Sequence, residues 1–183
     1  MRPDDEHRQQ APRVVRCFVL TVSDTRTEAT DTGGRAVAEL LEAAGHTISG
    51  RALVKDDMSE VRDIVLQQIV SPEVDVVVTT GGTGITSRDS TYEAVDGLLE
   101  KRLDGFGELF RMLSFQKIGT STIQSRAIGG VAGGTYLFAL PGSTGAVKDA
   151  WDDILVFQLD NRHRPCNLVE LMPRLQEHLK AAE

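Results

Sequence analysis

The sequence has few of the residues that build metal and redox centres. It contains only two cysteines and four histidines, without a CxxC pair and without a histidine cluster. Because a zinc site needs several such ligands at close spacing, these counts argue against zinc bound by histidine and cysteine. Cys17 lies inside an apolar run and is expected in the core, whereas Cys166 follows a proline and is expected at the surface.

Long apolar segments and an excess of positive charge are also missing. No run approaches the ~20 apolar residues of a membrane helix, and residues 1–12 lack the apolar region of a secretory signal. We therefore expect a cytoplasmic protein without a membrane partner, with a disordered tail at 1–12 and a single domain at 13–183. The formal net charge of -7 argues against nucleic-acid binding but not against a small anionic ligand.

What the chain does contain is an alternation of short apolar runs and amphipathic stripes. Apolar runs predict a buried strand at 14–22, a second strand at 46–54, a turn followed by another buried strand within 71–80, and a fourth strand at 135–141. The stripes predict helices near 36–44, 61–69, 90–99, 105–114, 146–155 and 168–180, with extended pieces and a Gly-rich turn at 120–134. Such alternation predicts an α/β fold, a three-layer sandwich whose mostly parallel sheet has helices on both faces.

Three of the predicted strands end in loops of unusual composition. These loops are Ser23-Asp24, the segment from Gly81 to Gly84, and Pro141-Gly142-Ser143. In a parallel sheet the carboxyl ends of the strands lie at one edge, where α/β proteins bind ligands. We therefore expect the three loops to lie close together.

The segment TTGGTG, which ends at Gly84, is the first candidate for an anion site. Glycine allows positive φ and lets a ligand approach main-chain N–H groups, and a helix that begins nearby adds further donors. The segment has neither the lysine of a Walker A loop nor the spacing of GxGxxG. A tight turn without a ligand would explain the same glycines.

Two aspartates are candidate ligands for a magnesium ion that arrives with phosphate groups. Asp56 follows the second predicted strand and precedes Asp57, whose position suits a helix N-cap. Asp89 lies between Arg88 and Ser90, and Ser90 has the spacing of a capping box. A solvated carboxylate paired with Arg88 is the alternative for Asp89.

Hydroxyl groups mark two further candidates. Ser143 precedes the stripe at 146–155 and either caps that helix or binds a second anion. The stretch from 114 to 126 is rich in hydroxyl groups and ends in an arginine, so it either lines a polar pocket or satisfies a sheet edge. Its candidates for ligand contact are Ser114, Ser121 and Arg126.

Six segments together resemble one protein family. They are TVSDTR, DTGG, TTGGTGITSRD, GFGELFRMLSFQKIGTSTIQSRA, LPGST and QLDNRHRPCN. The resemblance extends from Val14 to Asn167 and is to the MoaB/MogA family of molybdenum cofactor biosynthesis. The block RMLSF–IGTS–QSRA and the ending RPCN resemble the MoaB branch of that family.

The resemblance implies the molybdopterin-binding fold, molybdopterin as ligand, and a homo-trimer or homo-hexamer. MogA-type relatives transfer AMP from MgATP to the terminal phosphate of molybdopterin, and two aspartates of that pattern correspond to Asp56 and Asp89. These two are the predicted catalytic residues, which would hold Mg²⁺ through the phosphates. The predicted substrate- and phosphate-binding residues are Thr80, Gly81, Gly82, Thr83, Gly84, Ser114, Ser121, Arg126, Pro141, Gly142 and Ser143.

Alternatives to an adenylyltransferase stay open. Some MoaB-branch proteins lack the first aspartate, so the presence of Asp56 favours catalysis with ATP and Mg²⁺. The loop at 141–144 reads PGST, whereas many relatives have PGxP or PGNP. The main alternative is a non-catalytic molybdopterin carrier or scaffold. An unrelated nucleotide-binding regulator has less support, because no Walker lysine is present.

Overall fold

The structure, a computed structural model, describes residues 13–177. The predictions made for residues 1–12, and for the end of the last helix near Lys180, lie outside the described residues. Within residues 13–177, no helix is long and apolar enough to cross a membrane.

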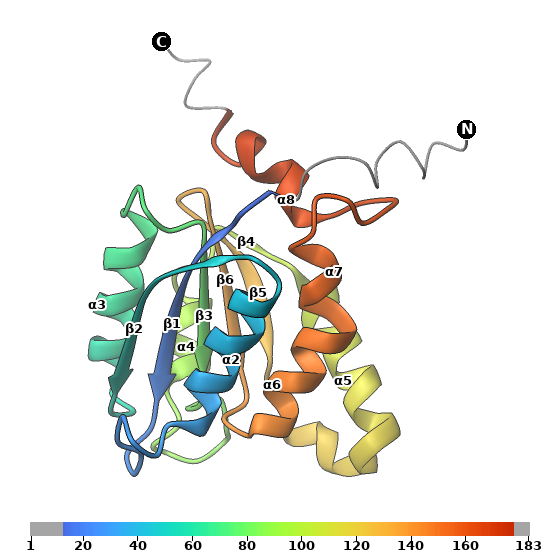
Figure 1. Cartoon of the computed structure of the whole chain (residues 1–183). Helices are drawn as coiled ribbons and strands as arrows, with labels where there is room; N and C mark the ends of the chain where they lie inside the picture. Colours follow the sequence, from blue (N-terminus) through green and yellow to red (C-terminus); the bar gives the residue numbers. More distant parts are fainter. Residues whose placement is uncertain (1–12, 178–183) are drawn as a thin grey trace.

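A six-stranded sheet forms the centre of the molecule (Figure 1). Its strands are β1 Arg16–Val22, β2 Thr47–Val54, β3 Val76–Thr80, β4 Lys101–Arg102, β5 Ile128–Ala132 and β6 Thr135–Leu140. The order across the sheet is β2-β1-β3-β6-β5-β4. The strands β2, β1, β3 and β6 are parallel, whereas β5 pairs antiparallel with β6 and β4 with β5. The prediction of a mostly parallel sheet is confirmed.

Helices cover both faces of this sheet. They are α2 Thr32–Ala43, α3 Met58–Ile69, α4 Thr91–Asp96, α5 Asp104–Ile118, α6 Thr144–Ala150, α7 Val156–Gln158 and α8 Leu168–Leu171, with the 3-10 turns η1 Gly119–Gln124 and η3 Met172–Arg174 and the π-helical turn η2 Trp151–Leu155. Side chains of α2, α5 and α6 pack in one apolar layer, and those of α3 and α4 pack in the other. The predicted three-layer sandwich is therefore confirmed.

The core residues follow from the sequence pattern. Every residue of β3 is buried, as expected of a β-branched run in the middle of a parallel sheet. Trp151 is 7% exposed and belongs to the first apolar layer, where burial of such a side chain contributes about 2–3 kcal/mol. Cys17 is fully buried, and burial raises the pKa of its thiol to about 12, whereas Cys166 is exposed. Both cysteine predictions are confirmed.

Some predicted helix boundaries are wrong. The helix α4 ends early, at Asp96, and α5 continues beyond its predicted end, to Ile118. The last predicted helix stops at Leu171, and the chain continues as a 3-10 turn that contains Pro173. Proline has no N–H to donate and its ring crowds the preceding turn, so a regular helix is not favoured there.

The segment 120–134 was predicted as extended, but its first part is helical. Residues up to Gln124 belong to η1, where Thr122 Oγ1 donates to the carbonyl oxygen of Arg111 at 3.3 Å. This contact folds the segment back onto α5. The extended part begins later, at β5.

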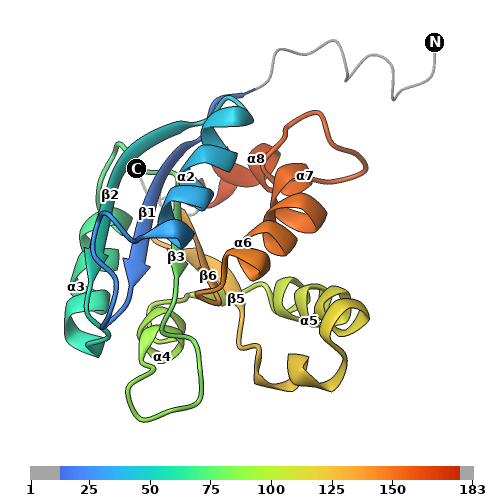
Figure 2. The ribbon, with the colours of Figure 1, turned by 60° about the horizontal axis from the view of Figure 1, so that its bottom comes forward.

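The parallel register brings four strand ends to one edge of the sheet. Thr21 pairs with Thr80, Thr80 with Leu140, and Val22 with Val54. This edge is at the bottom of Figure 1, opposite α8. Figure 2 turns it toward the viewer and shows the segment between β3 and α4 looping outward there.

Candidate functional site

The loops after β1, β3 and β6 meet at the carboxyl edge of the sheet, as the strand pattern predicted. A Cβ atom added at Gly142 would lie 3.1 Å from Gly81 Cα, and one added at Gly33 would lie 3.5 Å from the Gly142 carbonyl oxygen. A cavity of about 70 Å³ lies between these loops. It is lined by Thr21, Val22, Ser23, Arg26, Asp31, Gly33, Thr80, Gly81 and Gly142.

Gly81 makes the tight turn at the end of β3. Its φ is 96°, and a Cβ atom there would lie 2.1 Å from the Val22 carbonyl oxygen, so no side chain fits. Its N–H donates to the Leu140 carbonyl oxygen at 3.0 Å. Thr80, which is 1% exposed, donates its hydroxyl to the Pro141 carbonyl oxygen at 3.2 Å. Thr80 and Gly81 therefore join the loops after β3 and β6.

The next two main-chain amides differ from that of Gly81. Gly82 also has positive φ, 66°, and a Cβ atom there would lie 2.2 Å from Thr91 Oγ1 and 2.6 Å from Asp56 Oδ2. Among residues 13–177, the N–H groups of Gly82 and Thr83 have no acceptor. Consecutive main-chain donors of this kind, close to the start of a helix, are typical of anion sites.

Asp56 reaches this glycine segment from the end of β2. It is 8% exposed, and its Oδ1 accepts hydrogen bonds from Ser90 N at 2.9 Å and Ser90 Oγ at 2.6 Å. Ser90 precedes α4, as predicted, but its hydroxyl makes no cap hydrogen bond. The predicted capping role of Ser90 is wrong because Asp56 binds its hydroxyl instead. Asp57 does cap α3, since its side chain accepts from Ser59 N and Glu60 N.

Asp89 closes the outer part of the same loop. Its Oδ2 accepts from Thr86 N at 2.8 Å and Thr86 Oγ1 at 2.6 Å. The hydrogen bond from the Thr86 hydroxyl is the main cause that lowers the pKa of Asp89; burial raises it, and the main chain of Thr86 and Gly84 and the charge of Arg126 lower it further. Asp89 is therefore an ionised carboxylate on the glycine segment.

Arg88 does not pair with Asp89, which was the alternative drawn from the sequence. Its Nε and Nη2 atoms donate to Asp24 Oδ2 and Oδ1 at 3.0 and 2.9 Å. Asp24 Oδ1 also accepts from Asp56 N at 3.1 Å. The hydrogen bond from Arg88 is the main cause that lowers the pKa of Asp24. Asp24 thus links the loops after β1, β2 and β3, and the sequence pattern did not assign it this role.

The two predicted catalytic aspartates fit a magnesium ion bound together with phosphate groups. Asp56 Oδ2 and Asp89 Oδ1 have no hydrogen-bond donor within the described part of the chain. That part also contains no group of three or more acidic, histidine or cysteine side chains that could hold a metal ion alone. Mg²⁺ commonly uses one or two carboxylates and completes its coordination with water and substrate phosphates. Asp56 and Asp89 offer that kind of ligand set.

Arg126 reaches the glycine segment from the other side, between η1 and β5. It donates from Nε to the Thr83 carbonyl oxygen at 3.0 Å and from Nη2 to the Gly84 carbonyl oxygen at 2.6 Å. It also pairs with Glu93 and lies over the Tyr92 ring, 4.7 Å from the centroid. Sequence reasoning had not included Glu93 or Tyr92 in the site.

The predicted serines occupy different environments. Ser114 is 4% exposed on α5, whereas Ser121 is exposed on η1. Ser143 caps α6, since its Oγ accepts from Ala146 N at 3.1 Å. The cap predicted as one alternative for Ser143 is therefore present, and ligand contact by the three serines stays a prediction.

Comparisons with known proteins agree with these features. The family model described as probable molybdopterin binding domain matches residues 18–161. Molybdenum cofactor biosynthesis protein B of Bacillus anthracis is 51% identical over 155 residues, which cover 84% of this chain and 92% of that protein.

Solved structures show the same relationship. A crystal structure of molybdenum cofactor biosynthesis protein B has a TM-score of 0.83 at 46% identity and covers 92% of this chain and 99% of its own. The tungsten cofactor synthesizing protein MoaB from Pyrococcus furiosus has a TM-score of 0.71 at 39% identity and covers 79% and 92%.

Proposed function

Because the chain belongs to the MoaB/MogA family, with the molybdopterin-binding fold of molybdenum cofactor biosynthesis, we propose that it adenylylates molybdopterin with MgATP. One observation carries the proposal. Two carboxylates, Asp56 and Asp89, lie against a glycine segment whose Gly82 and Thr83 amides have no acceptor among the described residues. Acidic groups beside unpaired donors suit a ligand that brings both phosphate and a cation.

The reaction needs little covalent chemistry from the protein. An oxygen of the terminal phosphate of molybdopterin attacks the α-phosphorus of ATP, a new P–O bond forms, and the bond to the β-phosphate oxygen breaks as pyrophosphate leaves. The protein aligns the groups and stabilises the crowded negative charge. When bound, Mg²⁺ supplies positive charge at the phosphate oxygens, and Asp56 and Asp89 would hold it.

The strand-end loops divide the phosphate contacts between them. The amides of Gly82 and Thr83 hold one phosphate group, and the loop from Pro141 to Ser143 holds the other. The two loops touch at Gly81 and Gly142, where a Cβ atom on Gly142 would lie 3.1 Å from Gly81 Cα. Such contact keeps the two phosphate groups close enough to react. Ser121 is exposed on η1, whereas Ser114 is buried, so Ser121 is the more accessible of these two candidates for contact with the pterin.

The assembly is part of the same proposal. On the outer face of α5, Leu109, Met112, Phe115 and Ile118 are 37–56% exposed, and Ile123 of η1 is 84% exposed. An apolar stripe of this kind is unfavourable in water and marks an interface. We propose that further copies of the chain cover it in a homo-trimer or homo-hexamer, which sedimentation or size-exclusion measurements with light scattering would identify. A monomer in solution would contradict this assignment.

An adenylylation assay tests the function. The protein is incubated with molybdopterin, ATP and Mg²⁺, and adenylylated molybdopterin and pyrophosphate are measured. We expect Asp89→Asn and Asp56→Asn to lower turnover on the order of 100-fold, with molybdopterin affinity nearly unchanged. Asp160→Asn, at the opposite edge of the sheet, is the matched control and should leave the rate unaltered. If the protein binds molybdopterin but forms no adenylylated product, the proposed enzymatic activity is wrong.

The carrier alternative predicts a different binding pattern. A carrier or scaffold would bind molybdopterin and ignore nucleotide, so ATP affinity is measured with and without Mg²⁺. The proposed enzyme should bind ATP more tightly with Mg²⁺, and Asp56→Asn together with Asp89→Asn should remove that difference. Equal losses of molybdopterin affinity and of turnover in Asp89→Asn would make Asp89 a binding residue only.

A further inference from the structure

Arg126 has the most extensive set of contacts around the glycine segment. Nε and Nη2 donate to the carbonyl oxygens of Thr83 and Gly84, and Nη1 and Nη2 donate to the Glu93 carboxylate. The guanidinium also lies over the ring of Tyr92. Within residues 13–177, these contacts use four of the five N–H donors, so the guanidinium could offer a phosphate group only one Nη1 hydrogen without breaking a contact.

The contacts to the carbonyl oxygens control the direction of the neighbouring N–H groups. In a trans peptide the C=O and the following N–H point in opposite directions. By binding the carbonyls of Thr83 and Gly84, Arg126 fixes the N–H groups of Gly84 and Ile85 on the side away from itself. Asp89 lies on that side, since the Gly84 main chain contributes to lowering its pKa.

The neighbours of Arg126 explain why it can hold this position. Glu93 and Tyr92 both belong to the first turn of α4, which fixes the guanidinium against the helix. The same helix holds the preceding carbonyl, because Thr91 N donates to Gly82 O at 2.9 Å. The side chain of Arg126 is only 27% exposed, so solvent competes little for its donors. A planar fork with donors at fixed angles suits this task better than an ammonium group.

We propose that Arg126 is a positioning residue, which holds the glycine segment in the shape that presents the Gly82 and Thr83 N–H groups to the phosphates of the nucleotide, and which touches neither substrate. This rests on the proposed adenylylation, and it assigns Arg126 a different role from the ligand contact that the sequence predicted. Arg126 comes shortly after the hydroxyl-rich turn η1. Its side chain therefore connects this part of the chain with the glycine segment.

Four variants test the assignment. Arg126→Ala removes all contacts, Arg126→Lys keeps the charge without the fork, and Glu93→Gln weakens the support while leaving the carbonyl contacts. Arg162→Ala is the matched control, because within residues 13–177 the Arg162 side chain pairs only with Asp160, in an exposed loop at the other edge of the sheet. Far-ultraviolet circular dichroism and thermal unfolding establish that each variant is folded, and Arg126→Lys serves if Arg126→Ala does not fold.

The first measurement is independent of enzymatic activity. Hydrogen–deuterium exchange of the Thr86 and Thr91 amides, which donate to Asp89 and to the Gly82 carbonyl oxygen, should become about tenfold faster in Arg126→Ala, since the segment opens more readily. Affinity for inorganic pyrophosphate should fall with it, while affinity for molybdopterin stays within twofold of the wild type. Arg162→Ala should change none of these values.

The second measurement uses the reaction itself. We expect kcat to fall about 100-fold in Arg126→Ala through misplacement of the phosphates, and less in Glu93→Gln. Free guanidinium at low concentration should restore part of the rate in Arg126→Ala but not in Arg126→Lys, whose side chain still fills the position.

The outcomes separate the two proposals. If the wild-type protein forms no adenylylated product, the proposed function fails, and exchange and pyrophosphate binding still decide the role of Arg126. Unchanged exchange and pyrophosphate affinity in Arg126→Ala would overturn the positioning role. So would a loss of molybdopterin affinity as large as the loss of rate, because that result would make Arg126 a substrate contact.

Discussion

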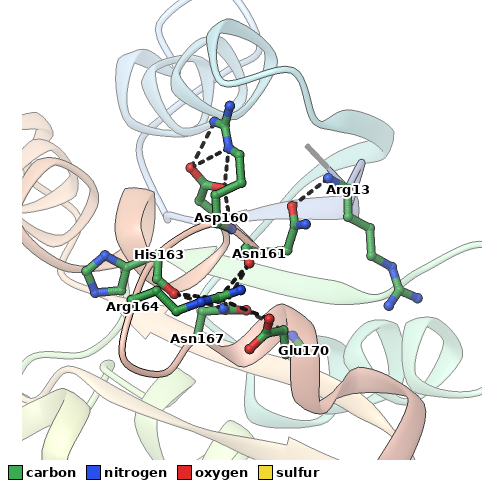
Figure 3. Close-up of polar contacts among 8 residues, drawn as sticks. Arg13, Asp160, Asn161, His163, Arg164, Asn167 and Glu170 are labelled. Carbon is green, nitrogen blue, oxygen red and sulfur yellow. Dashed lines mark hydrogen bonds and ion pairs between the residues drawn. The ribbon is translucent and has the colours of Figure 1, made fainter. Parts of the chain in front are cut away.

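The two edges of the sheet use polar residues in opposite ways. At the carboxyl edge, the Gly82 and Thr83 amides and one oxygen each of Asp56 and Asp89 have no partner among the described residues. At the amino edge, the loop between α7 and α8 pairs its charged side chains with one another (Figure 3). Charge alone therefore does not mark a site, because both edges are rich in it. Polar groups left unpaired beside a glycine turn distinguish the edge at which we propose that the ligand binds.

The loop at the amino edge illustrates the structural use of polar groups. Asn167 is 2% exposed, caps α8 by accepting from Glu170 N at 2.9 Å, and donates to the carbonyl oxygens of Asn161 and His163. Arg164 donates to the same two carbonyl oxygens and pairs with Glu170 at 3.0 Å. These contacts, drawn in Figure 3, hold the turn in one shape.

The largest expected effect comes from filling the glycine turn. In Gly81→Ala the added carbon would lie 2.1 Å from the Val22 carbonyl oxygen at a φ of 96°. We expect the free energy of unfolding, measured with urea, to fall by about 3 kcal/mol or more. Gly145→Ala is the control, because nothing lies within 4 Å of a Cβ atom there, and it should change stability by about 1 kcal/mol at most. Similar losses of unfolding free energy in both variants would contradict the clash expected at position 81.

A smaller effect is expected at the opposite edge. Asn167→Ala removes the cap of α8 and two buried donors, so the free energy of unfolding should fall by about 1–2 kcal/mol. Adenylylation per folded molecule should be unchanged. Asn167→Asp keeps the cap acceptor but places a carboxylate oxygen against the carbonyl oxygens of Asn161 and His163, so it should be at least as destabilising as Asn167→Ala. A loss of turnover per folded molecule in either variant would contradict the assignment of a structural role to one edge and a ligand-binding role to the other.

The smallest effect depends on pH. Asp75 precedes β3 and accepts from Arg16 N and Nε, both at 2.9 Å. Burial raises the pKa of Asp75, but the hydrogen bonds and charge of Arg16 outweigh it, so the net pKa is below the ordinary 3.8. A lowered pKa stabilises the fold above pH 3.8, and this contribution disappears as the pH falls through the lower value.

The comparison of wild type with Asp75→Asn measures this contribution. At pH 7 the variant should be about 1 kcal/mol less stable in urea unfolding, and the difference should shrink once the pH is below 3.8. Turnover near neutral pH should be the same in both. A difference that grows in acid would contradict the sign of the shift.

Much of the fold could be predicted because it follows from local patterns. The run VVVTT could only be a buried strand, and Asp57 had the position of an N-cap before it was seen to bind Ser59 N and Glu60 N. Boundaries that depend on tertiary contacts were missed. The turn η1 forms because Thr122 reaches back to α5, and no periodicity reports that contact.

The candidate site, like the fold, could be predicted from the sequence only in part. Strand–loop–helix order placed the glycine segment and Asp56 at one edge, since parallel strands end together. The hydrogen-bond partners of Ser90, Arg88 and Arg126 could not be predicted, because each of these side chains binds a residue of a loop other than its own. Asp24 could have been found by the same strand-end argument, as it directly follows β1 in a loop already noted for its composition.

The meeting point of the three loops has one further consequence. Gly81 and Gly142 meet through main-chain atoms, so this part of the cavity wall offers no side chain to exchange, whereas Thr21, Asp31 and Thr80 line other parts of it. Point substitutions there disturb the scaffold before they alter selectivity. We therefore expect divergence in ligand preference within this architecture at positions whose side chains line the cavity, such as Arg26, and not at these glycines.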